Sequence, residues 1–139
     1  MRKLLCTLPV AFLVLAAGSS EPASQSQGGQ QTSLTGRWTM SADAYGTPLF
    51  FALELAQEGN QITGKFAGDK LEGTFNGSSL SFLAKDERGG TEKCDATVIR
   101  TKGQPNTIVG TLVFTGAGDG ARATSYKFTA KQVPPRPSL

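Results

Sequence analysis

The chemistry open to this chain is limited first by the residue types that it lacks. The sequence has 139 residues and no histidine, which excludes Ser-His-Asp and Cys-His catalysis and every metal site that needs imidazole. Cys94 has no cysteine nearby with which to hold a structural zinc. We therefore predict no catalytic residues, no cofactor and no metal. An enzyme would have to perform acid–base chemistry with Asp, Glu, Tyr or Lys alone.

Two segments resemble functional motifs in sequence but lack the neighbouring structure that those motifs require. Asp86 and Glu87 are adjacent carboxylates, but neighbours on a strand point to opposite faces, and Arg88 follows directly. We interpret them as part of a solvated, charge-compensated loop. The glycine-rich residues 116–120 resemble a phosphate-binding loop, which requires a helix N-terminus behind it. Residues 121–131 have a strand pattern instead, so we predict a turn between two strands.

The N-terminal segment has the three parts of a secretory signal peptide. Arg2 and Lys3 form a basic start, residues 4–17 form an apolar run, and small residues follow it. The run is shorter than the roughly 20 residues that cross a bilayer. Ser19 stands where a bacterial lipoprotein would carry its lipidated cysteine, and Cys6 is too early for that role. We expect a bacterial-type signal at 1–18, a secreted or periplasmic location, no lipid anchor, and no membrane span after cleavage.

Removing this segment changes the charge and the cysteine count. The chain has 14 basic and 11 acidic residues, but Arg2 and Lys3 leave with the signal, so the rest is nearly neutral. A near-neutral domain lacks the concentrated basic surface that nucleic-acid binding demands. Cys94 then stands alone and cannot form an internal disulfide. We interpret it as a small buried strand residue; a reactive thiol and an intermolecular link are the alternatives.

Composition divides the remaining chain into three parts. Residues 19–33 are polar and nearly free of apolar bulk, which predicts a disordered linker. Residues 34–132 have the patterning of one domain. Residues 133–139 are rich in proline, which stops a strand and favours a short polyproline-like tail.

Period-two alternation of apolar residues recurs along the domain, punctuated by Gly, Asn and Asp. Asn76-Gly77 is the strongest hairpin signal among these turns. No stretch sustains a helical period between caps. Strands are expected at about 36–45, 49–58, 62–66, 71–75, 80–84, 93–101, 106–115 and 122–131. Closing a meander into a barrel removes both of its edges, so we predict an all-β fold, an eight-stranded antiparallel up-and-down β-barrel.

Three expected strands place a glycine between two apolar residues of the inward phase. The motifs are Ile62-x-Gly64-x-Phe66, Leu71-x-Gly73-x-Phe75 and Ile108-x-Gly110-x-Leu112. Glycine at such a position lets a strand bend sharply, as a small barrel requires. A ligand cavity left by the missing side chains is the alternative explanation.

Two short segments carry a resemblance to known barrels. The first expected strand opens with Ser33-Leu34-Thr35-Gly36-Arg37-Trp38-Thr39, and the third contains Ile62-Thr63-Gly64-Lys65-Phe66. A Gly-x-Trp at the start of an eight-stranded meander resembles the calycin barrels, the lipocalins and avidins, and both segments are similar to those of avidins. The resemblance implies a calycin-like barrel in which Trp38 packs across one end and helps to close it. It rests on about a dozen residues.

The resemblance does not extend to the avidin biotin site. Avidins place an Asn just after the Trp-Thr pair and a Ser a few residues later, where this chain has Met40 and Ala44. Trp38 is the only tryptophan, so the later tryptophans that wall a biotin pocket are absent. The Thr-Asp-Tyr-type segment of lipocalins is missing too. The resemblance therefore implies a fold and not a ligand. Small barrels of this kind are also similar to exported bacterial domains and to periplasmic enzyme inhibitors.

The inward phase of the expected strands is almost entirely apolar. Its bulky members are Trp38, Met40, Leu49, Phe51, Leu53, Leu55, Ile62, Phe66, Leu71, Phe75, Leu80, Phe82, Val98, Ile108, Leu112, Phe114, Tyr126 and Phe128. A barrel of eight strands is just wide enough to be filled by side chains or to hold one small ligand. Specific sites need a few convergent polar groups, and the candidates here are the Tyr126 hydroxyl and the Trp38 N–H. We expect any ligand to be apolar and to contact Trp38, Met40, Phe51, Phe82 and Tyr126.

These observations favour an exported, non-catalytic binding barrel that holds a small apolar ligand at an open end. The alternative is a protein-binding module, or a periplasmic enzyme-inhibitor-like domain, that presents residues 86–91 and 116–122 to an exported protein partner. An enzyme and a purely structural protein are the remaining hypotheses. A cavity would favour the ligand carrier, whereas a filled barrel with a rigid exposed apolar loop would favour the protein-binding module.

Overall fold

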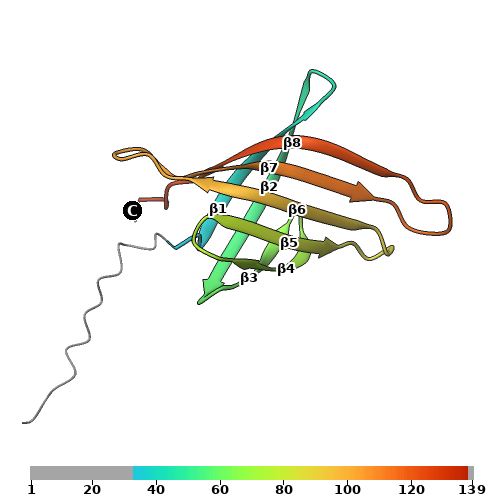
Figure 1. Cartoon of the computed structure of the whole chain (residues 1–139), viewed down its shortest axis with the longest axis horizontal. Coiled ribbons are helices and arrows are strands. Elements are labelled where there is room, and N and C mark those ends of the chain that lie inside the picture. Colours follow the sequence, from blue (N-terminus) through green and yellow to red (C-terminus); the bar gives the residue numbers. More distant parts are fainter. Residues whose placement is uncertain (1–32, 138–139) are drawn as a thin grey trace, which may run out of the picture. The chain divides into compact units, whose positions relative to one another are not determined.

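Eight antiparallel strands, each paired with its neighbours in sequence, close into a barrel (Figure 1). The computed structural model describes residues 33–137. The expected signal peptide at 1–18, nearly all of the expected linker at 19–33, and the last two residues of the tail lie outside the described residues. The strands are β1 (Gly36–Ala44), β2 (Thr47–Glu58), β3 (Gln61–Phe66), β4 (Asp69–Phe75), β5 (Ser79–Lys85), β6 (Thr91–Ile99), β7 (Thr107–Thr115) and β8 (Ala123–Gln132).

Pairing of the first strand with the last closes the barrel. β1 pairs with β8 from Trp38↔Gln132 to Ala42↔Phe128, so the prediction of an eight-stranded antiparallel meander barrel is confirmed. Strand bounds differ from the predicted ones by a few residues. The shift matters at β6, which begins at Thr91 rather than at residue 93. The turn before it closes early, because the Asp86 N–H donates to the Gly90 carbonyl at 3.0 Å.

The inner faces of the strands, together with Leu34 of the entering segment, form an apolar core. Its buried residues are Leu34, Trp38, Met40, Ala42, Leu53, Leu55, Ile62, Phe66, Leu71, Phe75, Leu80, Phe82, Ala84, Cys94, Val98, Ile108, Leu112, Phe128 and Ala130. The expectation that Leu49 belongs to this core is wrong, because its side chain is 38% exposed. Leu49 has the right phase, but the pairing of β2 with β3 begins only at Leu53, so Leu49 lies beyond the rim of the barrel.

Trp38 closes the end of the barrel at which the chain enters. Its side chain is 1% exposed, and its indole Nε1–H donates to the Leu34 carbonyl at 2.9 Å. The Leu34 N–H donates in turn to Gln57 Oε1 at 2.9 Å, which fastens the entering segment to β2. The role that the avidin resemblance implied for Trp38 therefore agrees with its place in the fold.

All three inward glycines of the repeated motifs mark close approaches between neighbouring strands. A Cβ atom at Gly64, Gly73 or Gly110 would overlap a backbone carbonyl oxygen of the strand beside it, that of Glu54, Ser81 or Asp95 respectively. Backbone from the next strand already fills the space that a side chain would take. These glycines therefore serve the curvature of the barrel, and the alternative of a ligand cavity at these three positions is wrong.

The β1–β2 hairpin extends beyond both of its neighbours and projects from the barrel (Figure 1). β1 pairs with β8 only as far as Ala42, and β2 pairs with β3 only from Leu53, so residues 43–50, which we call the arm, are paired only within the β1–β2 hairpin. The arm ends in a tight turn, in which the Gly46 N–H donates to Asp43 Oδ1 at 2.7 Å. Tyr45 is 94% exposed and Phe50 is 69% exposed, so the arm presents aromatic surface to solvent.

Candidate functional site

The two ends of the barrel differ in what surrounds them. Trp38 and the entering chain cover one end. The other end, which we call the mouth, carries the connections at residues 45–46, 67–68, 86–90 and 116–122. A ligand that reaches the inner face of the barrel must therefore enter through the mouth.

Five aromatic rings form a continuous cluster on the inner face beneath the mouth. The Phe114 ring lies at its centre, with centroids 5.8 Å from Phe51, 6.2 Å from Phe66 and 5.7 Å from Tyr126. Phe66 also contacts Phe51, at 5.2 Å, and Phe82, at 6.2 Å. Phe51, Phe114 and Tyr126 are half-buried, whereas Phe66 and Phe82 are buried. The cluster therefore fills the barrel below the mouth and leaves three rings partly open to solvent.

A carboxylate lies on the inner face beside this cluster. Glu92 is in phase with the buried Cys94 on β6, and it pairs across to Ala84 on β5 and Phe114 on β7. Its side chain is 8% exposed, and its Oε2 atom has no hydrogen-bond partner among the described residues. A buried polar atom without a partner costs free energy of folding, so its presence at a mouth points to a functional role.

The environment of Glu92 disfavours its charged form. Burial raises the pKa of the carboxyl above its ordinary value, and the negative charges of Asp69 and Asp86 raise that pKa further. Asp69 begins β4, and Asp86 begins the connection between β5 and β6. Asp86 Oδ1 already accepts hydrogen bonds from the backbone N–H groups of Arg88 and Gly90, both at 2.8 Å. The mouth therefore places the carboxylates of Glu92, Asp69 and Asp86 close enough to interact, beside its aromatic surface.

The raised pKa of Glu92 predicts a distinct pH dependence of stability. Below the ordinary value of 4.5 the carboxyl is protonated in both the folded and the unfolded state, and its contribution to folding is complete. As the pH rises through the folded pKa, that contribution is lost. Urea unfolding across the pH range should show Glu92→Gln to be more stable than the parent by about 1 kcal/mol or more at pH 8, and equal to it at pH 4. Glu54→Gln, at an exposed position of β2, should match the parent throughout. Parallel curves for the parent and Glu92→Gln would contradict this interpretation.

The structure brings together some of the residues expected to contact a ligand. Phe51 and Tyr126 meet at Phe114, and Phe82 joins them through Phe66. Met40 is fully buried below the rim. Trp38 belongs to the opposite, closed end, and the Leu34 carbonyl already accepts its N–H. The expectation that the Trp38 N–H is free for a ligand is therefore wrong.

Glu92 is the inward polar residue that the strand pattern missed, so the expectation of an almost entirely apolar inward phase is wrong at this position. The predicted strand began at residue 93, which left Glu92 in the preceding loop. The spacing of the strand could have revealed it, because every second residue from Glu92 through Cys94 and Ala96 to Val98 lies on the same, inward face.

Cys94 is a core residue rather than a reactive thiol. It is fully buried, and burial raises the pKa of its thiol to about 12, with a smaller contribution from the charge of Asp95. At pH 8 the thiolate fraction is then lower by about a thousandfold than for a thiol with a pKa of 9. We expect iodoacetamide to modify Cys94 only at the rate of unfolding, and rapidly in urea. Fast modification of the folded domain would show an open path to the core.

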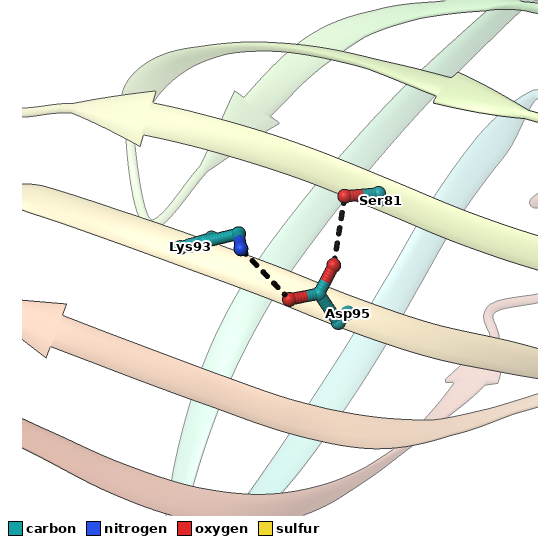
Figure 2. Close-up of polar contacts among 3 residues, drawn as sticks. All are labelled: Ser81, Lys93 and Asp95. Carbon is teal, nitrogen blue, oxygen red and sulfur yellow. Dashed lines mark hydrogen bonds and ion pairs between the residues drawn. The ribbon is translucent and has the colours of Figure 1, made fainter.

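The outer face carries a polar cluster whose groups satisfy one another. Asp95 Oδ2 lies 3.3 Å from Lys93 Nζ, and Asp95 Oδ1 accepts from Ser81 Oγ at 2.9 Å (Figure 2). The Lys93 and Asp95 side chains are 61% and 60% exposed, so this is solvated surface. Within residues 33–137, no group of three or more His, Cys, Asp or Glu side chains is placed to hold a metal ion. Over the same residues, no helix is long and apolar enough to cross a membrane.

Comparison with known proteins supports the fold. No protein-family model and no curated protein matches the sequence. A crystal structure of a rhizavidin–biotin complex is similar to the chain, with a TM-score of 0.60 at 13% identity. The match covers 77% of this chain and 98% of that chain. The barrel therefore has an avidin-like, calycin-like fold, as the Gly-x-Trp opening of the first strand implied.

Proposed function

We propose that this chain is an exported, non-catalytic binding barrel that takes one small, largely apolar ligand at its mouth. The observation that carries the proposal is the set of half-buried rings of Phe51, Phe114 and Tyr126 beside the Glu92 carboxylate, whose Oε2 atom has no hydrogen-bond partner among the described residues. The core below the mouth is filled, so the proposal rests on the open rings and the carboxylate, which together supply the apolar surface and the polar group of a typical small-ligand site. Export is supported by the signal-like pattern of residues 1–18.

The depth of the core determines where such a ligand would lie. Met40, Phe66 and Leu112 below the mouth are at most 1% exposed, so a ligand would lie on the rings at the mouth rather than in the centre of the barrel. The similar rhizavidin structure is a complex with biotin. That likeness is one of fold, and it supports ligand binding by a barrel of this shape without indicating biotin here.

Titration of the exported protein with hexan-1-ol, followed by NMR, tests this proposal. We expect saturable shifts that centre on Phe114 and Tyr126 and leave Tyr45, on the arm, unchanged. Tyr126→Ser should weaken the binding, and Tyr45→Ser should preserve it, because Tyr45 is 94% exposed and is not one of the five clustered rings. Native mass spectrometry of protein purified gently from its host should then reveal the natural cargo as extra mass released on denaturation. An absence of saturable shifts at the mouth with hexan-1-ol, hexylamine and hexanoate alike would overturn the proposal.

A second function, protein binding, is favoured by the arm. Tyr45 and Phe50 expose aromatic surface there, and the arm has strand edges that pair with neither β3 nor β8. A shallow depression lies between the arm and β8, lined in part by Asp43, Pro48 and Lys127. Such an edge suits a partner that adds a strand. In cells, cross-linking through the arm should capture one specific exported protein, and a Tyr45→Ser/Phe50→Ser variant should lose it without a change in Tm.

A further inference from the structure

We propose that the mouth selects an organic cation, with an ammonium group beside Glu92 and an apolar body on the rings of Phe51, Phe114 and Tyr126. This inference rests on the proposed function of the mouth as a small-ligand site. It adds the chemical class of the ligand, where the sequence alone indicated an apolar molecule.

The first support is a set of three carboxylates, those of Glu92, Asp69 and Asp86, that take part in no ion pair among residues 33–137. Glu92 has a buried oxygen without a hydrogen-bond donor, and the charges of Asp69 and Asp86 act on it. The ion pairs among residues 33–137 join Lys70 to Glu72 and Lys93 to Asp95, and neither pair includes one of these three carboxylates. A bound cation would supply the missing donor, and it would also relieve the repulsion among the three groups.

The second support is the aromatic surface directly beside the carboxylate. Phe114 is the cross-strand neighbour of Glu92 on the inner face, a pairing that brings side chains within contact distance. Phe114 is also the ring at the centre of the cluster, in contact with Phe51 and Tyr126. Ring faces attract cations, so one ammonium group could interact with the Glu92 carboxylate and an aromatic face together.

Three other ligand classes, a metal ion, a neutral alcohol and a carboxylate, fit these observations less well. Among the described residues, no group of three or more His, Cys, Asp or Glu side chains is placed to hold a metal ion, so Glu92, Asp69 and Asp86 do not form a metal site. A neutral alcohol could donate one hydrogen bond to the Oε2 atom of Glu92, but it would leave the charge of the three carboxylates unchanged. A carboxylate ligand would add to that charge.

A matched series of six-carbon probes tests the inference: hexylamine, hexan-1-ol and hexanoate, titrated by calorimetry at pH 8 into the exported protein. We expect hexylamine to bind about ten- to a hundredfold more tightly than hexan-1-ol, and hexanoate to bind most weakly. Glu92→Gln should reduce the preference for the amine to about twofold. Glu54→Gln, at an exposed position of β2 away from the mouth, should keep the full preference and so controls for the overall loss of one negative charge.

The outcomes separate this inference from the proposed function. Equal binding of hexylamine and hexan-1-ol at the mouth would overturn the inference and leave the small-ligand function standing. Binding of none of the three probes would overturn both. An amine preference that persists in Glu92→Gln would also overturn the inference, because the selectivity would then come from another group. Far-UV circular dichroism of Glu92→Gln ensures that a loss of preference is not a loss of fold.

Discussion

Replacement of Gly73 by alanine should lower the free energy of unfolding by about 3 kcal/mol or abolish folding. The added methyl group would overlap the carbonyl oxygen of Ser81 and the Phe82 side chain on β5. These atoms belong to a paired strand, so the barrel can accommodate the methyl only by separating β4 from β5. That separation would strain the pairing around the whole closed sheet, because a barrel has no free edge at which to relax. Urea unfolding monitored by circular dichroism measures the loss.

Gly116→Ala is the matched control for this prediction. Gly116 lies in the β7–β8 connection, and a Cβ atom there would make an ordinary contact, 3.9 Å from the Ala121 Cβ. We expect its stability to lie within about 0.5 kcal/mol of the parent. Gly110→Ala, which would overlap the Asp95 carbonyl oxygen, should behave like Gly73→Ala. Equal stabilities for the Gly73 and Gly116 variants would show that β4 and β5 tolerate a side chain, and the curvature explanation would then fail.

The barrel could be predicted from the sequence because its determinants are local. Period-two alternation marks each strand, and turns such as Asn76-Gly77 set where pairing reverses. Closure could be predicted because an open meander leaves two strand edges with unpaired backbone groups, and a closed barrel removes them. The Gly-x-Trp opening added a specific end-closing role for Trp38, and the hydrogen bond from Trp38 to Leu34 agrees with it.

The features missed by the sequence depend on where pairing between strands stops. Glu92 is buried because the turn before β6 closes early and brings Thr91 into register with Lys85. Leu49 is exposed because β3 does not extend far enough to cover it. The alternation within a strand shows which face a residue occupies, but register with a distant strand decides whether that face is covered. The candidate site and the arm both lie at the rim of the barrel, where the register with the neighbouring strand decides whether a side chain is covered.

Replacement of Trp38 by alanine should cost about 3–5 kcal/mol of stability while leaving the selectivity of the mouth intact. The indole is 1% exposed, so its loss opens a cavity that the rigid barrel cannot fully collapse around, and it also leaves the Leu34 carbonyl without its donor. Trp38→Phe also loses the hydrogen bond but keeps most of the apolar volume, so it should cost less stability. The difference between the two variants measures the contribution of packing.

The two readouts should diverge, because Trp38 and Glu92 serve opposite ends of one barrel. Chemical unfolding should report a large loss for Trp38→Ala, and the folded fraction should still prefer hexylamine to hexan-1-ol. Glu92→Gln should show the reverse, with stability gained at pH 8 and preference lost. A site whose unpaired charge destabilises the fold is tolerated when that charge is used for binding. Loss of the amine preference in folded Trp38→Ala would instead show that the closed end takes part in binding, and the assignment of the ligand site to the mouth would be wrong.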